Sequence, residues 1–169
     1  RIILIASKLL AVPVSLLTIV VKDKQFFKSV LGLDEPWQSN RETPLSHSFC
    51  QYVVLTGEPL IVEDATQHPL VHDNLAIRDL GVISYLGVPV NLPDGERLGS
   101  FCVISPEVRR WTNEDVQLVT DLSEMIMTEI RLRSENLQLV AIDEERRNLV
   151  HKLQSANKQL ADQRDAVVR

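Results

Sequence analysis

The sequence of 169 residues lacks the short motifs that carry common catalytic chemistry. Its six glycines form neither GxGxxG nor GxxxxGK(S/T), the backbone loops that hold nucleotide phosphates. The α/β-hydrolase motif GxSxG and the zinc-peptidase motif HExxH are also absent. The carboxylates are scattered, with no spacing that sets two of them opposite each other. We therefore predict that this chain is not an enzyme.

Cysteine is scarce as well. Cys50 and Cys102 are too few for a disulfide framework and lack the CxxC spacing of a zinc site. His68 and His72 have the i, i+4 spacing of metal or haem ligands on a helix, but Pro69 between them disfavours a regular helix. We expect no metal, and a reducing cytoplasm as the location of the protein.

No strong excess of charge of either sign is present, and no basic stripe is interleaved with aromatic residues. The net charge is only −5, so nucleic acid is not expected as a partner. The apolar run over residues 2–21 is long enough to cross a bilayer, but Lys8 and Pro13 interrupt it. A helix through Ala11 followed by a strand from Val14 explains this run better, so membrane insertion is not expected.

Glycine and proline are confined to the first part of the chain. All six glycines and all eight prolines precede residue 107, and the last 39 residues contain neither. Such a contrast separates a loop-rich body from one long helix. We predict a globular domain over residues 1–130 and a coiled-coil helix over residues 131–169.

Short apolar runs between turn residues predict the strands of the body. The expected strands are 14–21, 25–31, 60–63, 84–91 and 97–105, the last two joined by a turn at Pro93-Asp94-Gly95. A loop is expected over 32–44, a helix over 46–56 ending at Gly57, and irregular helical turns over 64–80 with Asp73 or Asn74 as a cap. Thr112 and Asp115 form a capping-box pattern for the last helix. These elements predict an α+β fold, an antiparallel sheet with helices on one face.

The last helix carries a heptad pattern. Positions spaced alternately three and four residues apart form a seam that is apolar at eight of eleven positions. The seam consists of Leu132, Glu135, Leu139, Ile142, Arg146, Leu149, Leu153, Ala156, Leu160, Gln163 and Val167. The simplest partner for such a seam is a second copy, so we expect a parallel homodimer. Arg146 costs stability in the seam, and this suits a stalk that changes packing during signalling; a plain dimerisation stalk is the alternative.

Several segments, in order, resemble a large class of bacterial GAF domains. They are KQFFKS (24–29), LSHSFC (45–50), TGEPLIVEDA (56–65), HP (68–69), DN (73–74), LGVPV (86–90) and LGSFCVI (98–104). Each segment is a weak signal alone, and the order and spacing over roughly residues 1–130 make the resemblance strong.

The resemblance implies a GAF/PAS-like central sheet, dimerisation through helices, and a pocket beneath residues 64–84. Similar domains bind cyclic nucleotides, tetrapyrroles, haem or nothing known, and precede output domains such as histidine kinases or diguanylate cyclases. The NKFDE constellation of phosphodiesterase GAF domains is absent, and neither cysteine is followed by the histidine of bilin-binding relatives. The resemblance implies a small-molecule sensor that transmits a signal to a C-terminal output domain, and among the family's ligands a cyclic nucleotide is the effector to consider first. The alternatives are a ligand-free dimerisation module, a chromophore or haem sensor, and a redox sensor that uses the cysteines.

Polar and aromatic residues expected to face the pocket are the ligand-binding candidates. They are Ser48, Cys50, Asp64, Asp73, Asn74, Arg78, Ser84, Tyr85 and Cys102. Tyr85 suits stacking on a planar ring, and Arg78 suits a phosphate or carboxylate. An ordinary surface pair between Arg78 and Asp73 is the alternative, and buried cysteines are most often plain core residues.

Overall fold

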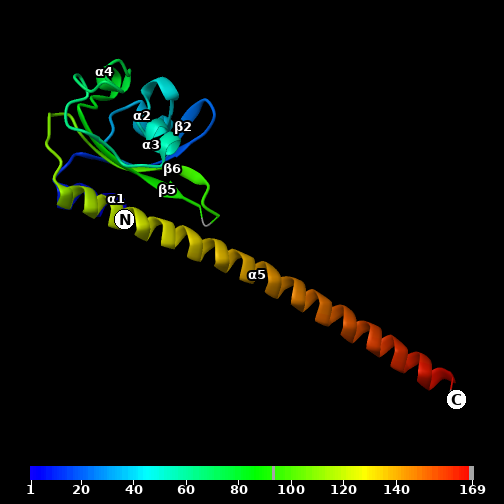
Figure 1. Cartoon of the computed structure of the whole chain (residues 1–169). Coiled ribbons are helices and arrows are strands. Elements are labelled where there is room, and N and C mark those ends of the chain that lie inside the picture. Colours follow the sequence, from blue (N-terminus) through cyan, green and yellow to red (C-terminus); the bar gives the residue numbers. More distant parts are fainter. Residues whose placement is uncertain (93, 168–169) are drawn as a thin grey trace. The chain divides into compact units, whose positions relative to one another are not determined.

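The computed structural model of the protein describes residues 1–92 and 94–167, with side chains described up to residue 164 (Figure 1). Pro93 of the predicted turn, the side chain of Val167 in the predicted seam, and residues 168–169 lie outside the described residues. The chain falls into two units, Arg1–Glu129 and Ile130–Arg169.

The first unit is built on one six-stranded sheet in the order β3-β2-β1-β6-β5-β4, with every neighbouring pair antiparallel. The strands are β1 (Val14–Val20), β2 (Lys24–Leu31), β3 (Glu42–Pro44), β4 (Leu60–Val62), β5 (Ser84–Asn91) and β6 (Arg97–Ser105). The hairpins β1–β2 and β5–β6 confirm the predicted antiparallel α+β fold. Strand β6 is central because β1 and β5 pair with its two edges.

Five α-helices and one 3₁₀-helix are found in the described residues. They are α1 (Ile2–Leu10), α2 (Trp37–Asn40), the 3₁₀-helix η1 (Leu45–His47), α3 (Cys50–Thr56), α4 (Ala76–Leu80) and α5 (Asn113–Val167). The capping box is confirmed, since Thr112 N donates to Asp115 Oδ2 at 3.0 Å and Asp115 N donates to Thr112 Oγ1 at 3.1 Å. Gly57 ends α3 with φ of 76°, a conformation that favours glycine.

Two local predictions were wrong. The segment 32–44 is not a plain loop, because it contains α2 and the edge strand β3. The expected helix over 46–56 is interrupted at Ser48 and Phe49, which separate η1 from α3. The interruption turns the Ser48 hydroxyl inward, where it donates to Gln25 Oε1 at 2.6 Å.

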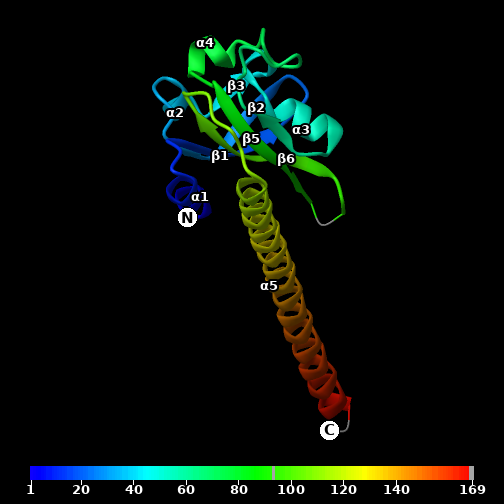
Figure 2. The same cartoon turned by 60° about the vertical axis from the view of Figure 1, so that its left-hand side comes forward.

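The prediction that helices cover one face of the sheet was also wrong. Helices α2, α3 and α4 lie on one face, and α1 and the beginning of α5 lie on the other (Figures 1 and 2). The first turns of α5 are attached to β5, since Ser123 Oγ donates to the carbonyl of Pro89 at 3.0 Å and Asn91 N donates to Met127 Sδ at 3.4 Å. Successive side chains of a strand point to opposite faces of the sheet. Residues 101–104 of β6 are all apolar, so this strand presents apolar side chains to both faces.

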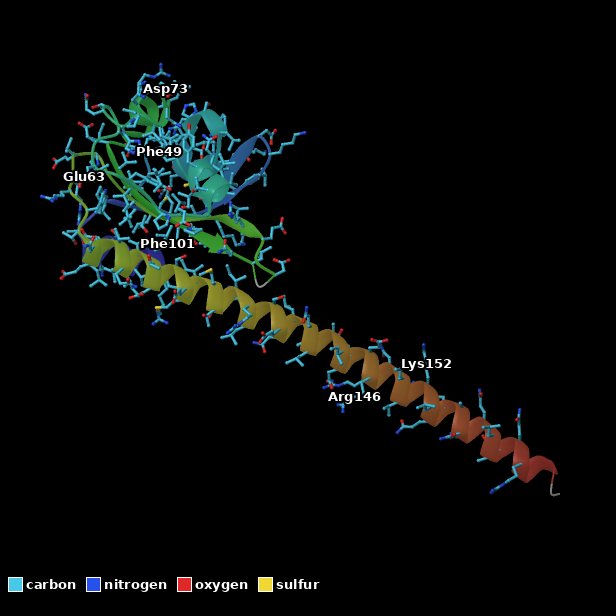
Figure 3. All side chains as sticks on the ribbon, in the orientation of Figure 1. Phe49, Glu63, Asp73, Phe101, Arg146 and Lys152 are labelled. Atoms are coloured by element: carbon cyan, nitrogen blue, oxygen red, sulfur yellow. The ribbon has the colours of Figure 1, made fainter. Side chains whose placement is uncertain are left out.

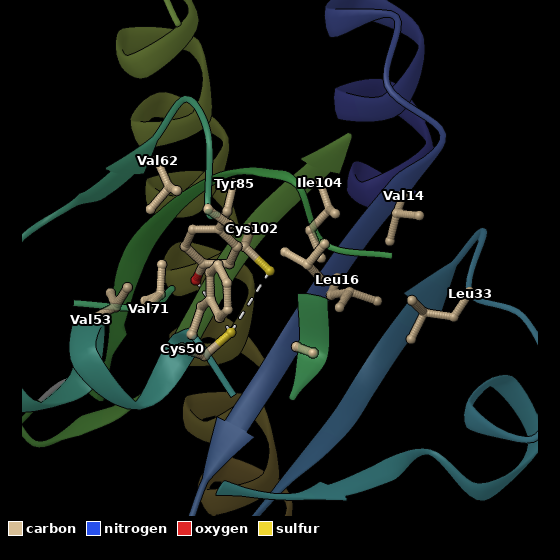
Figure 4. Packing of buried hydrophobic residues seen from close by; sticks show 14 of the residues in the cluster. Val14, Leu16, Leu33, Cys50, Val53, Val62, Val71, Tyr85, Cys102 and Ile104 are labelled. Carbon is tan, nitrogen blue, oxygen red and sulfur yellow. Dashed lines mark hydrogen bonds between the residues drawn. The ribbon is translucent and has the colours of Figure 1, made fainter. Parts of the chain in front are cut away.

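The two faces hold two buried layers. Cys102 and Ile104 belong to the cluster with α3 and α4, and Figure 4 shows this packing. Phe101 and Val103 point to the opposite face, and both are fully buried. A signal that moves β6 therefore acts on both layers at once.

Candidate functional site

A small internal cavity lies on the α3–α4 face of the sheet and has a volume of about 20 Å³. Strands β1, β2, β5 and β6 contribute residues to it, as do η1, α3 and α4, and Phe49 and Val82 come from the connections beside these helices. Its lining residues are mostly apolar: Leu16, Gln25, Phe27, His47, Phe49, Cys50, Ala76, Leu80, Val82, Tyr85, Cys102 and Ile104.

The internal cavity is too small for an organic ligand. A volume of about 20 Å³ suffices for one water molecule, because a water needs at least about 10–15 Å³ of this measure. Sites for small organic ligands have volumes of roughly 300–1,000 Å³. We call residues 74–80 the α4 segment. A nucleotide would enter this space only after the α4 segment moved away from the sheet.

The polar atoms at the cavity come from a compact group around the two cysteines (Figure 4). Cys50 Sγ, at the start of α3, lies 3.8 Å from Cys102 Sγ on β6. The phenol of Tyr85 donates to Cys50 Sγ at 3.3 Å, and its oxygen lies 3.3 Å from Ser100 Oγ. All of these side chains are buried. The group is thus a buried dithiol with hydroxyl groups beside it.

Hydrogen bonding makes the two thiols unequal. Donation from Cys102, helped by Thr18, Tyr85 and Ser100, lowers the pKa of Cys50 to about 7 against the opposing effect of burial. Burial, together with donation to Cys50, raises the pKa of Cys102 well above its ordinary value. Burial likewise raises the pKa of Tyr85, so its phenol stays protonated and remains a donor. Cys50 is therefore the thiol that ionises first.

Gly87 makes room for the Tyr85 ring. A Cβ at this position would lie 2.1 Å from Tyr85 Oη and 2.5 Å from its Cζ. Tyr85 is also confined on another side by Phe49, whose ring centroid lies 5.3 Å from that of Tyr85. Glycine at position 87 therefore allows the phenol to lie along the strand and reach Cys50.

Replacing Gly87 by alanine should lower the free energy of unfolding by about 1–3 kcal/mol, the usual range for overpacking a core. Urea denaturation followed by circular dichroism measures the change. The matched control is the same substitution in a Tyr85→Leu background, where the ring is gone and the added cost should fall below about 0.5 kcal/mol. An equal cost in both backgrounds would show that the Tyr85 ring is not what the methyl group meets.

Hydrogen bonds hold the α4 segment against the rest of the body. Asn74 Nδ2 donates to the carbonyl of Ser48 at 3.2 Å, and Asn74 Oδ1 accepts from Ala76 N at 3.0 Å. The N-cap of α4 is Leu75, without a side-chain cap hydrogen bond, so the prediction of Asp73 or Asn74 as the cap was wrong. His47 Nε2 lies 2.9 Å from Asp79 Oδ2, and Trp37 Nε1 donates to the carbonyl of Asp79 at 3.3 Å. We call His47, Asp79 and Trp37 the α4 latch.

Charge stabilises this latch. Arg78 donates to both carboxylate oxygens of Asp79, at 2.6 and 2.9 Å. Hydrogen bonds from Arg78 and His47 hold the pKa of Asp79 well below its usual range. The carboxylate is therefore charged at any physiological pH and available to both partners.

A second, outer cleft of about 400 Å³ opens beside the latch. The segments 13–14, 32–34 and 78–81 line it together with Trp37, Ile104 and Pro106. Leu80 and Ile104 line both this cleft and the internal cavity, so the two spaces meet at these side chains. The outer cleft has the volume of a small-molecule site, and the inner cavity does not.

The candidate residues predicted from the sequence fall into three groups. Cys50, Tyr85 and Cys102 line the internal cavity. Ser48 and Asn74 do not line it, and they are joined to each other, since the Asn74 side chain donates to the carbonyl of Ser48. Of the other four, Arg78 lines the outer cleft, and Asp64, Asp73 and Ser84 line neither space. A role in ligand binding stays a prediction for the whole set.

The four outlying candidates have identifiable surroundings. Asp64 accepts from Thr66 N and Thr66 Oγ1, a local turn. Ser84 donates to the carbonyl of Val62 at 3.1 Å and so joins β5 to β4. Asp73 is exposed. The alternative of a surface pair between Arg78 and Asp73 was wrong, because the partner of Arg78 is Asp79.

Sequence reasoning missed the latch residues and the spacing role of Gly87. Trp37 was assigned to a plain loop, and nothing in the sequence relates it to Asp79, 42 positions away. One available signal was Gly87 itself, since an isolated glycine within a strand often marks a close approach.

Two features are missing from the described residues. Over residues 1–92 and 94–167, no group of three or more His, Cys, Asp or Glu residues could hold a metal ion. Within the same ranges, none of the helices combines the length and apolar character that a membrane crossing needs.

Comparison with known proteins gives consistent matches. The family model described as GAF domain matches residues 1–130. A cyclic di-GMP phosphodiesterase of Pseudomonas aeruginosa is 34% identical over 134 residues, which are 78% of this chain and 22% of that protein. A diguanylate cyclase of Escherichia coli is 33% identical over 76 residues, 41% of this chain and 22% of that protein. The chain thus spans about a fifth of the length of either relative.

Solved structures agree on the fold. The GAF domain of a phosphoenolpyruvate-protein phosphotransferase from Coxiella burnetii superposes with a TM-score of 0.64 at 19% identity. The alignment covers 80% of this chain and 82% of that one. At this identity the similarity concerns the fold alone.

Proposed function

The chain belongs to the GAF domain family, and on this premise we propose that it is the regulatory input module of a longer cytoplasmic signalling protein. Both curated relatives are named as enzymes of cyclic di-GMP metabolism, and the chain spans only about a fifth of each. We therefore infer an output domain of the diguanylate cyclase or cyclic di-GMP phosphodiesterase type, in preference to a histidine kinase. The chain itself senses and transmits, and catalysis belongs to the output domain.

The observation that carries this proposal is the continuity of α5. This helix is attached to β5 through Ser123 and Met127, and it then continues to Val167 without interruption. A displacement of β5 or β6 therefore acts directly on the first turns of a 55-residue helix. Stiff elements of this kind carry small shifts over long distances.

A second copy of the chain is the partner that we propose for the exposed seam of α5. Leu139, Ile142, Leu149, Leu153 and Leu160 are each more than half exposed on the isolated chain. Ala156 and Arg146 are exposed seam positions as well, and Figure 3 shows Arg146 and Lys152 projecting from different sides of the helix. Apolar side chains at heptad spacing leave water when a partner helix packs on them, as in a parallel coiled coil. Residues 130–167 supply about 57 Å of helix for this contact.

Further apolar side chains are exposed on the face of the sheet opposite the cavity. Ile5 and Leu9 are one helical turn apart on α1, and Met125 of α5 is 55% exposed. These positions suit the dimerisation through helices that the family resemblance implies. The homodimer therefore has two candidate contact regions within each chain.

The outer cleft is the candidate effector site. Arg78 uses two of its five N–H donors on Asp79 and has three more for an anionic group. Trp37 offers an aromatic surface in the same cleft. A cyclic nucleotide supplies both a phosphate and a planar base, and it is the first effector to test. Its binding would act on Leu80 and Asp79, and so on the α4 latch.

Titration calorimetry with cyclic AMP and cyclic GMP tests this site. We expect binding by at least one of them, and Arg78→Ala should weaken that binding about tenfold or more, as hydrogen bonds to charged groups usually do. Arg110→Ala is the matched control, because Arg110 is an exposed arginine outside the cleft. Absence of heat and of any thermal shift with both nucleotides removes them from the proposal.

A second candidate function is favoured by the size of the internal cavity. At about 20 Å³, the cavity suits a ligand-free GAF domain that only dimerises and positions its output domain. Native mass spectrometry of the purified protein separates the two functions. A bound small molecule supports the sensor, and a ligand-free dimer that binds neither nucleotide supports the dimerisation module.

A further inference from the structure

The only two cysteines of the chain meet although 52 positions separate them. Cys50 Sγ and Cys102 Sγ lie 3.8 Å apart, and a disulfide needs about 2.05 Å, so a shift of under about 2 Å would join them. Both side chains are almost completely buried. No other thiol of the chain can compete for either one.

The surroundings give the two thiols opposite pKa shifts. Tyr85 and Cys102 both hydrogen-bond to Cys50 Sγ. Hydrogen bonding of this kind favours a thiolate and lowers the pKa of Cys50 to about 7. Cys102 remains a protonated thiol next to it. A thiolate with a neighbouring second thiol is the usual arrangement of an oxidisable pair.

A route for a small oxidant exists at the internal cavity. Both cysteines line it, and so do His47 and Leu80, whose side chains are themselves partly exposed. Leu80 also lines the outer cleft. The cavity beside the sulfurs and the outer cleft therefore share a wall, and a molecule close to water in size needs only a small displacement of these side chains to pass.

We propose that Cys50 and Cys102 form a reversible redox pair that a hydroperoxide oxidises to an intramolecular disulfide. The Cys50 thiolate attacks one peroxide oxygen; the O–O bond breaks, and the leaving hydroxide takes a proton and departs as water. Cys102 then attacks the resulting sulfenic sulfur, the S–S bond forms, and the sulfenic oxygen leaves with the Cys102 proton as a second water. In total, two thiols and one hydrogen peroxide give one disulfide and two waters, with two electrons passing from sulfur to peroxide.

The disulfide would bind the start of α3 to the central strand. Cys50 opens α3, and Cys102 lies at the middle of β6, which pairs with β5. The carbonyl of Ser48, two residues before Cys50, accepts from Asn74, so the α4 segment follows the same movement. The oxidation chemistry does not depend on the proposed output domain, so either can fail without the other.

Treatment of the folded protein with hydrogen peroxide, followed by alkylation in denaturant and intact-mass measurement, tests the pair. The reduced chain takes up two alkyl groups, and the oxidised chain should take up none and regain both after dithiothreitol. The rate should rise with pH through about 7, as the fraction of Cys50 thiolate rises. Tyr85→Phe should slow the reaction several-fold, because it removes one donor to the thiolate and keeps the ring.

Single-cysteine variants identify the attacking thiol. Cys102→Ser should leave a sulfenic acid on Cys50 that dimedone traps, and Cys50→Ser should react at least tenfold more slowly. Near-ultraviolet circular dichroism checks that each variant is folded. The proposal is overturned if the folded wild type forms no intramolecular disulfide, or if Cys50→Ser reacts as fast as Cys102→Ser.

Discussion

Replacing Leu149 and Leu153 together by lysine should convert the protein from a dimer into a monomer at micromolar concentration. Both leucines occupy predicted seam positions and are more than half exposed on the isolated chain. Burying one leucine contributes about 1.5–3 kcal/mol, and a dimer would lose four of them. Even the lower value gives about 6 kcal/mol, which corresponds to roughly a ten-thousandfold weaker association. Four lysines facing one another would weaken it further.

Sedimentation velocity of the wild type and the variant measures this change. The matched control is Asn148→Lys with Ser155→Lys, which adds the same charge to the same part of α5 at positions outside the seam. The control should remain dimeric. A double-leucine variant that sediments as a dimer would mean that the contact between copies is made by another surface, for which α1 is the next candidate.

The strands were predictable because apolar runs and turn residues agree along the chain. Strands β5 and β6 have the predicted bounds, and their hairpin is present. The sequence analysis did not predict that helices cover both faces of the sheet, although the sequence of β6 indicates it. Phe101 to Ile104 is a continuous apolar run, and a strand with one face in solvent alternates instead.

The candidate site was less predictable than the fold. Cys50, Tyr85 and Cys102 were selected because they were expected to face a pocket, and they do line the cavity. Arg78 was also expected to face that pocket, and it lines the outer cleft instead. Its direction depends on how the five-residue helix α4 ends and on the neighbouring carboxylate of Asp79, and no periodic pattern is long enough there to fix it.

The contacts that matter most at the site join residues far apart in the sequence. His47 and Asp79 are separated by 32 positions, and Cys50 and Cys102 by 52. A single sequence gives residue types and local periodicity, but the packing of α3 on β6 decides which of them meet. The same packing relates the proposed redox pair to the proposed signalling helix. Cys102 lies on β6, β6 pairs with β5, and β5 holds the first turns of α5.

Oxidation of the dithiol should raise the free energy of unfolding by about 4 kcal/mol. A disulfide between positions 52 residues apart closes a long loop in the unfolded chain, and the loss of loop entropy at this length has about that size. Urea denaturation of the peroxide-treated and dithiothreitol-treated protein at equal concentration measures the difference. Cys102→Ser is the control, since it forms no disulfide within the chain and should show no gain. A gain near the full value would mean that the native body accepts the bond with little strain. An oxidised protein no more stable than the reduced one would mean that drawing Cys50 toward β6 costs as much as the loop closure contributes, and the body would then be held in a strained conformation able to act on α5.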